Sequence, residues 1–185
     1  MLPWDVAVAR RCVGTLARPL FAVQVREVRG GNPYALIDPA LVLSVAANET
    51  RCNSGVLGPD GEAGVMAIMV RTWTPTAEEL RNPAVSLEWG MWFLQCTLGD
   101  EEHNPYRDVR RALAAYNCGW DGVDSGRCGS GGYHYADRVL YHWLPLLTAE
   151  LQRLSDRTND PRMAEWLDGW GYGPREFCSR TQDVE

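Results

Sequence analysis

The sequence predicts a mainly α-helical fold, with about eight helices in a single domain and little or no β-sheet. The first observation behind this prediction is size, because 185 residues suffice for one compact domain and are few for two. The second is composition: 45% apolar and 23% charged residues are ordinary for a chain that buries a core. The third is periodicity, since apolar residues recur mostly at helical spacing and no repeat or low-complexity linker interrupts the chain.

The N-terminal part of the chain, residues 1–35, is expected to form a helical segment. A helix is predicted from Trp4 to Ala17 and should end before Pro19, which lacks the N–H that a helix interior needs. The stretch Phe21–Val28 is either a short strand or more helix. Glycine and proline in residues 30–33 then predict a turn.

A capped helix is predicted next. Asp38 is a suitable N-cap and Pro39 suits the first helical position, so this helix should run from Pro39 to about Thr50. The glycine- and proline-rich stretch Asn53–Gly64 predicts a loop. Shorter helices are expected over Gly64–Arg71 and Thr76–Leu80.

The second half of the chain predicts further amphipathic helices. Pro83 opens one of them, and helical spacing predicts that its inward stripe consists of Val85, Trp89, Trp92, Phe93 and Cys96. The same spacing recurs at Val109, Leu113 and Tyr116.

A long helix is predicted from Tyr135 to about Leu154, and Pro145 should kink it. Its apolar face is predicted to carry Val139, Trp143, Leu147 and Leu151. A short helix is expected over Pro161–Trp170. Residues 156–185 are therefore interpreted as a Trp-rich tail that packs on a core formed by residues 36–155.

Charge and hydropathy exclude two classes of partner. The net charge is −6, all 18 basic residues are arginine, and no basic run is present, so a nucleic-acid partner is not expected. No stretch approaches the roughly 20 apolar residues of a membrane-spanning helix, so membrane insertion is not expected either. The absence of lysine excludes a lysine nucleophile.

The six cysteines show no zinc-type spacing, and the three histidines show no metal spacing, so neither a metal nor any other cofactor is predicted. Nothing at the N-terminus is typical of an export signal, so free thiols in a reducing compartment are the default expectation. If a disulfide forms, Cys118 and Cys128 are the best-placed pair.

Glu49 is the candidate catalytic residue. Leu41, Val45 and Glu49 are spaced to share one helix face, so the carboxyl group points toward the core side at the C-terminal end of its helix. Burial and the negative end of the helix dipole both disfavour ionisation, and a protonated carboxyl group is what general-acid catalysis requires. The alternative is that Glu49 is turned into solvent or paired with Arg51.

Four sequence blocks follow one another along the chain. The first block runs from Glu49 and Asn53 through Pro59 and Gly61 to Gly64 and Met66. The second is Pro83-Ala84-Val85-Ser86-Leu87 with Gly90 and Phe93-Leu94, the third is Ala115-Tyr116-Asn117-Cys118-Gly119, and the fourth is Tyr135-Ala136-Asp137-Arg138-Val139-Leu140. The order of these blocks resembles the soluble lytic transglycosylase (SLT) family, lysozyme-like enzymes that cleave peptidoglycan glycan strands. The resemblance covers about residues 36–145 and implies a lysozyme-like α+β fold for this catalytic core.

Three positions depart from the family pattern. Thr50 replaces a serine and keeps the hydroxyl group, whereas Ala67 replaces a glutamine that helps to hold the sugar. Ser86 stands where the family has asparagine. Substrate contacts are therefore expected to be fewer than usual, while the acid is retained.

The resemblance implies a mechanism with one carboxyl group. Glu49 protonates the glycosidic oxygen, the substrate N-acetyl group stabilises the cationic centre, and ionised Glu49 then takes the C6 hydroxyl proton to form 1,6-anhydroMurNAc. The implied substrate-binding residues are Thr50, Asn53, Gly64, Met66, Tyr116, Asn117 and Tyr135. Tyr116 and Tyr135 have the alternative of being packed core tyrosines.

Two other sets of residues leave alternatives open. Asp60 and Glu62 follow the acid in a loop; they are either solvated, as loop acids usually are, or they face the cleft and activate water. Trp166 and Trp170 either pack in the core, which their helical spacing favours, or stack on sugar rings.

The leading hypothesis is a peptidoglycan lytic transglycosylase acting on the bacterial cell wall or in the periplasm. Because no signal peptide is recognised, we expect delivery by a bacteriophage, either in the virion beside other tail proteins or by release at lysis. The first alternative is a muramidase-type hydrolase on the same fold. The second is a phage tail structural or adaptor protein with weak or no activity, which the residues at Ala67 and Ser86 motivate.

Overall fold

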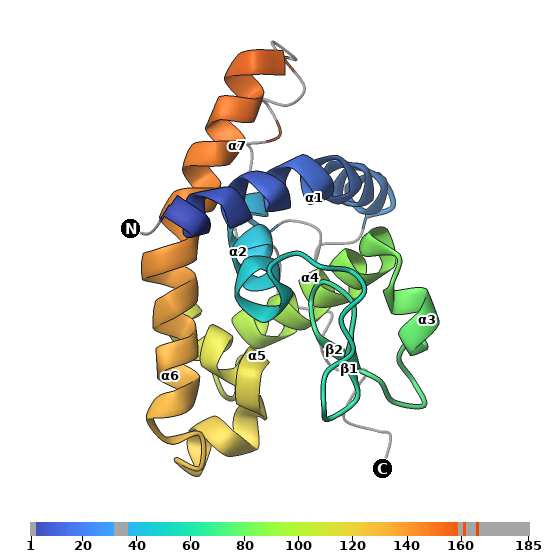
Figure 1. The fold of residues 1–185 in the computed structure, drawn as a ribbon. Helices are drawn as coiled ribbons and strands as arrows, with labels where there is room; N and C mark the ends of the chain where they lie inside the picture. The colour runs from blue at the N-terminus through green and yellow to red at the C-terminus, as the bar shows by residue number, and fades with distance from the viewer. Residues whose placement is uncertain (1–2, 32–36, 159–160, 162–165, 167–185) are drawn as a thin grey trace.

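The computed structural model describes residues 3–31, 37–158, 161 and 166, and its fold is mainly helical, as predicted (Figure 1). Helix α2 (Pro39–Thr50) lies at the centre. It packs against α1 (Pro3–Arg29), α4 (Pro83–Gly99), the π-helical segment η2 (Arg138–Trp143) and α7 (Leu144–Thr158). Helices α3 (Ala77–Leu80), α5 (Val109–Asp124) and α6 (Gly129–Asp137) and a two-stranded antiparallel sheet complete the fold.

The sequence of α2 explains why this helix holds the centre. The Asp38 carboxylate accepts a hydrogen bond from the Ala40 N–H at 2.7 Å, which confirms the predicted N-cap, and Pro39 starts the helix. Nearly every residue of α2 is buried, so neighbours surround the helix on all sides. It ends at Arg51, whose left-handed φ of 54° closes the last turn. Glu49 therefore lies in the last turn of a rigid, buried helix.

The prediction that the first helix ends before Pro19 is wrong. α1 continues to Arg29 with Pro19 inside it, so Phe21–Val28 takes its helical alternative. A proline inside a helix costs about 3 kcal/mol, but fully burying an apolar side chain contributes roughly 1.5–3 kcal/mol. Leu16, Leu20 and Val23 are all at most 2% exposed, so tertiary packing outweighs the local cost.

The predicted helix over Gly64–Arg71 is also wrong. This region forms a hairpin in which β1 (Glu62–Ala63) pairs with β2 (Ile68–Met69). Positive φ angles at Gly64 and Ala67 turn the chain between the strands, and such angles are incompatible with a right-handed helix. The hairpin packs on α4 and on α3, so its shape depends on neighbours distant in sequence.

The stripe predicted to face inward on α4 is only half-buried. The fully buried residues of this helix are Ser86, Leu87, Gly90, Met91, Leu94, Gln95 and Leu98. Trp89, Trp92 and Phe93 instead gather around Trp73, which is 43% exposed, with ring centroids 6.0 to 6.4 Å from it. Both faces of α4 are apolar, so periodicity alone did not distinguish the core face from this aromatic surface.

A π-helical segment just before Pro145 takes the place of the predicted kink at this proline. The helix begins at Gly129 rather than Tyr135 and widens into η2, where the Leu144 N–H bonds the Val139 carbonyl five residues back. This wider turn accommodates the missing N–H of Pro145 and the bulk of its ring. The predicted apolar face is confirmed, because Val139, Trp143, Leu147 and Leu151 are at most 2% exposed.

Disulfides replace the free thiols expected by default. Cys12 and Cys52 are bridged with Cα atoms 5.3 Å apart, and Cys118 and Cys128 form the pair that spacing had favoured. The first bridge joins α1 to the residue that follows Arg51 at the end of α2. It therefore anchors the helix turn that carries Glu49.

The division into residues 1–35, 36–155 and 156–185 stays a prediction. Of the tail, Trp166 is 5% exposed; its indole N–H donates to Gln24 Oε1 at 2.7 Å and its ring meets Phe21 edge-on. Trp166 thus packs in the core, whereas Trp170 lies outside the described residues. Within the part of the chain that the structure describes, no helix is both long and apolar enough to cross a membrane.

Candidate active site

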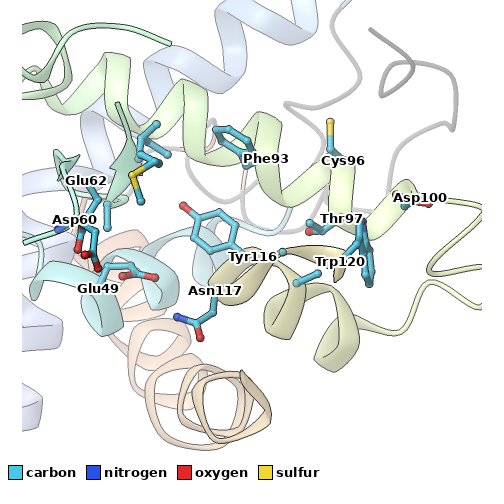
Figure 2. A pocket seen from close by; sticks show the side chains of 15 residues that line it. Glu49, Asp60, Glu62, Phe93, Cys96, Thr97, Asp100, Tyr116, Asn117 and Trp120 are labelled. Carbon is cyan, nitrogen blue, oxygen red and sulfur yellow. The ribbon is translucent and has the colours of Figure 1, made fainter. Parts of the chain in front are cut away.

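A cavity of about 590 Å³ opens between the hairpin, α4 and α5, at the C-terminal end of α2 (Figure 2). Glu49, Asp60 and Glu62 gather at one end, Trp120, Thr97 and Asp100 lie at the other, and Tyr116 lies between them. Phe93 covers one side and Asn117 extends from α5 on another. The cavity is therefore an elongated space with carboxyl groups at one end and aromatic walls.

Glu49 is half-buried and lines this cavity. Its burial raises the pKa of its carboxyl group, and the negative charge of Glu62 adds to the rise. The hydrogen bond from Tyr135 and the charge of Arg138 act in the opposite direction, but the pKa stays above its ordinary value. Arg51 lies over the Trp4 ring at 5.0 Å rather than pairing with Glu49, so the solvent-exposed alternative is not what the structure shows.

Tyr135 lies behind Glu49 rather than on the cavity surface. It is 9% exposed, and its hydroxyl donates to Glu49 Oε1 at 2.5 Å. Burial, followed by the negative charge of Glu49, raises the pKa of Tyr135 well above its ordinary value, while a hydrogen bond with the Asn48 side chain lowers it. The tyrosine therefore stays protonated and holds one oxygen of the carboxyl group in place.

Tyr116 lines the cavity, but its hydroxyl donates to the Met66 carbonyl at 2.7 Å and not to Glu49. The Met66 N–H donates to Ser86 Oγ at 3.1 Å, so both backbone groups of Met66 are held from outside the loop. The Met66 side chain is fully buried against Gly90. Ser86 therefore supports the cavity wall through the loop backbone, and the expectation of fewer substrate contacts stays a prediction.

Five of the seven predicted substrate-binding residues do not line the large cavity: Met66, Tyr135, Thr50, Asn53 and Gly64. The Thr50 hydroxyl donates to the carbonyls of Ala46 and Val65, and it ties α2 to the hairpin. Asn53 accepts the Gly55 N–H at 3.0 Å in its own turn. Gly64 has a φ of +75°, and a Cβ there would collide with the Leu80 carbonyl and with Ser86. Thr50, Asn53 and Gly64 shape the loop beside the acid.

Asn117 and Trp120 come from the C-terminal part of α5. Gly119, with φ 71° and ψ 162°, interrupts the helix between them, so Trp120 lines the far end of the cavity. The Trp120 ring stacks on His103 with centroids 5.3 Å apart, and His103 bonds Asp124 at 2.6 Å. Trp120 is thus held in a fixed orientation by neighbours outside the cavity.

Asp60 and Glu62 both line the cavity, and Asp60 is exposed to solvent as well, so their activation of water stays a prediction. Glu62 Oε2 accepts the Asp60 N–H at 3.1 Å, which holds the Glu62 carboxylate at the hairpin. Its charge is near enough to raise the pKa of Glu49. The site therefore contains a second carboxylate with electrostatic influence on the first.

Sequence reasoning missed Asn48, Phe93, Trp120 and Arg138 as residues of this region. Arg138 was detectable, because it lies three residues after Tyr135 on the same helix face. Trp120 directly follows the Tyr116–Gly119 block, and the glycine was a sign that the chain turns there. Phe93 had been assigned to an inward stripe, so helical spacing concealed it. Among the described residues, no cluster of three or more His, Cys, Asp or Glu side chains is suited to a metal.

Comparison with known proteins adds one finding to this geometry. The sequence model of the family described as "Transglycosylase SLT domain" matches residues 34–127, half of the chain. The match includes Glu49, the hairpin, α4 and the Tyr116 block, and it ends before Tyr135. No curated protein and no solved structure matches the chain significantly.

Proposed function

Because the chain belongs to the transglycosylase SLT domain family, we propose that it cleaves the β-1,4 bond between MurNAc and GlcNAc with Glu49 as its single general acid and base. The observation that carries this proposal is the state of Glu49. Its half-buried carboxyl group has a raised pKa, lies at one end of an elongated cavity and has one oxygen held by Tyr135. A carboxyl group that is neutral near its working pH donates a proton to a leaving oxygen.

In the first step, the proton passes from Glu49 to the glycosidic oxygen as the bond to C1 breaks. The Tyr135 hydroxyl bonds Oε1, so the other oxygen of Glu49 is available for the substrate. The substrate's own N-acetyl carbonyl stabilises the positive charge at C1, which makes a second protein carboxylate unnecessary. The leaving sugar departs with the proton on its new hydroxyl group.

In the second step, the ionised Glu49 removes the proton from the C6 hydroxyl, and that oxygen bonds to C1. The products are the released strand and a 1,6-anhydro sugar, and Glu49 regains its proton. The hydrogen bond from Tyr135 and the charge of Arg138 stabilise the carboxylate between the two steps. The same groups that limit the rise in pKa therefore prepare Glu49 to act as a base.

Hydrolysis is the second candidate function, and the position of Glu62 favours it. Asp60 and Glu62 line the cavity beside Glu49, where a carboxylate can orient a water molecule toward C1. A muramidase-type reaction would then give a reducing sugar in place of the anhydro product.

Product analysis distinguishes the two reactions. Purified peptidoglycan digested by the wild-type protein should give anhydromuropeptides, which are lighter than the hydrolysed products by one water in mass spectrometry. Glu49→Gln should abolish release, while Glu102→Gln, at an exposed position outside the cavity, should leave it unchanged. Unchanged release by Glu49→Gln would exclude Glu49 as the acid, and reducing-end products alone would favour hydrolysis.

That a bacteriophage delivers this protein to the cell wall stays a prediction. Mass spectrometry of purified phage particles tests it by searching for peptides of this protein. The structural or adaptor alternative loses part of its motivation, because Ser86 bonds the Met66 backbone and supports the cavity. Ala67 does line the cavity, with a left-handed φ of 49°. Activity on purified peptidoglycan would exclude a purely structural role.

A further inference from the structure

Glu49 also lines a second cavity, of about 340 Å³. This cavity is lined by residues of the first turn of α1, the last turn of α2, η2 and the loop after α2. Glu49 lines both cavities, so a group bound in the second one would lie beside the reacting sugar. We call this space the arginine cavity, because Arg51 and Arg138 line it.

Two residues that line the arginine cavity, Trp143 and Asn48, each have a buried polar atom with no hydrogen-bond partner among the described residues. The Trp143 side chain is 2% exposed, and its indole N–H is unsatisfied. The carboxamide oxygen of Asn48 is buried and unsatisfied as well. Leaving a buried donor or acceptor unpaired costs about 1–3 kcal/mol, so such atoms commonly mark a ligand or a bound water. One atom is a donor and the other an acceptor, which is the pair that an amide satisfies.

Two arginines, Arg51 and Arg138, line the arginine cavity, and both are exposed. Arg110, Arg111 and Arg26 each form an ion pair with a carboxylate. Arg51 and Arg138 form no ion pair with any carboxylate of the described residues, although the chain is acidic overall. Arg51 lies over the Trp4 ring, and Arg138 is near enough to Glu49 to lower its pKa. Two guanidinium groups in one cavity favour binding of a carboxylate, which they recognise through charge-assisted hydrogen bonds.

From these contacts we propose that the arginine cavity binds the carboxylate-bearing substituent of the muramic sugar next to the scissile bond. Arg51 and Arg138 bind the carboxylate, while the Trp143 N–H and the Asn48 oxygen bind an amide of an attached peptide. The carboxylate comes from one of two sources, an acidic stem peptide or the free lactyl group of a strand without peptide. The inference rests on the proposed function, because it assumes that a muramic sugar lies beside Glu49.

Binding to the uncleaving Glu49→Gln protein tests the proposal. Three soluble probes of equal length are compared by calorimetry: strands with stem peptides, the same strands after amidase treatment, and GlcNAc oligomers that carry no carboxylate. Both carboxylate-bearing probes should bind at least about tenfold more tightly than the GlcNAc oligomers. Adding Arg51→Gln should remove this difference without weakening the binding of GlcNAc oligomers.

Matched variants distinguish binding in the arginine cavity from general effects of charge and folding. Arg157→Gln removes the same charge from an exposed position on α7, outside this cavity, and should bind all three probes as the parent does. Trp143→Phe keeps an aromatic ring and removes the indole N–H, so it should weaken the peptide-bearing probe most. Thermal unfolding of each variant verifies that it is folded before its binding is interpreted.

The outcomes are distinct. If the probe with stem peptides binds more tightly than the amidase-treated probe, the cavity binds the carboxylate of the peptide. If the amidase-treated probe binds equally or more tightly, the cavity binds the carboxylate of the lactyl group. Equal binding of all three probes overturns the proposal, as does an Arg51→Gln variant that keeps the preference. Failure of the proposed function looks different: the wild-type protein would cleave no strand, yet the arginine-dependent preference in binding would persist.

Discussion

The hydroxyl of Tyr135 lies 2.5 Å from Oε1 of Glu49, although 86 positions separate the two residues in the sequence. Glu49 is held by the buried helix α2, and Tyr135 is held by α6, close to the start of η2. Burial favours the neutral form of Glu49, while this hydrogen bond favours the ionised form. The pair therefore sets how readily the acid gives up its proton and takes it back.

Tyr135→Phe should raise the pKa of Glu49, because it removes the largest influence that lowers it. The basic limb of the kcat/KM profile, where Glu49 loses its proton, should move to higher pH. A hydrogen bond to a charged group contributes about 1.5–3 kcal/mol, so the maximum rate should fall by roughly ten- to a hundredfold. Tyr141→Phe, at a 73% exposed position on η2, is the control. A limb that stays in place or moves to lower pH would contradict this assignment.

Glu62→Gln should shift the basic limb of the kcat/KM profile in the direction opposite to Tyr135→Phe. The negative charge of Glu62 raises the pKa of Glu49, so its removal should lower that pKa and move the basic limb to lower pH. Glu102→Gln removes a charge at an exposed site outside the cavity and should leave the profile unchanged. If Glu62 also orients water, the variant should lose reducing-end products while it retains anhydro products, which chromatography with mass spectrometry measures.

Glu49→Gln should make the protein more stable at neutral pH and leave stability unchanged in acid. The pKa of Glu49 in the folded state is raised above its ordinary value of 4.5. The stability that its protonated form contributes is thus fully present below about pH 4.5 and is lost as the pH rises through the folded-state pKa. A tenfold difference in acidity between the folded and unfolded states corresponds to about 1.4 kcal/mol. Urea unfolding at several pH values measures the difference between the two proteins, and equal stability at all of them would show that Glu49 is not desolvated.

Gly64→Ala should destabilise the fold by more than the cost of its backbone conformation alone. A Cβ at Gly64 would collide with the Leu80 carbonyl and with Ser86, and its φ of +75° adds strain. Gly61→Ala is the matched control, because its φ of +92° is also positive but no atom lies within 4 Å of the added Cβ. The control should cost about 1–3 kcal/mol, and Gly64→Ala should cost clearly more in chemical unfolding. Equal losses would mean that the loop moves freely to accommodate the methyl group.

The two disulfides should contribute unequally to stability. Cys12 and Cys52 are 40 positions apart, whereas Cys118 and Cys128 are 10 apart. Closing the longer loop restricts the unfolded chain more. The free energy of unfolding should therefore fall by about 4 kcal/mol when Cys12 and Cys52 are both changed to Ser, and by about 3 kcal/mol when Cys118 and Cys128 are. Thermal and urea unfolding of each variant measures this order. The loss of the first bridge should also reduce activity, because that bridge anchors the end of α2.

Much of the site was predictable because its determinants are local. Asp38 and Pro39 cap and start α2, and helical spacing from Leu41 places Glu49 on a buried face at its end. The family resemblance of the block from Ala115 to Gly119 implied that Tyr116 and Asn117 bind substrate, and both line the cavity. Caps, helical period and short motifs involve only neighbouring residues, so they are readable from the sequence.

Other features depended on partners far along the chain. Pro19 remains inside α1 because Leu16, Leu20 and Val23 are buried by other helices. Trp89 and Trp92 are only half-buried, and both meet the exposed Trp73 at the surface. Thr50, Asn53 and Gly64 match the family motif, yet they shape the loop rather than line the large cavity.

The sequence by itself determined the helical class of the protein and the family to which the chain belongs, and it identified Glu49 as the candidate acid. Only the tertiary structure decided which groups set the pKa of that acid, because Tyr135, Glu62 and Arg138 approach Glu49 from three different elements. It also decided that Arg51 and Arg138 line a cavity together with Trp143, whose indole N–H has no hydrogen-bond partner in the described part of the chain. The physical reason is that desolvation and charge interactions depend on distance in space, and packing of distant segments alone sets those distances.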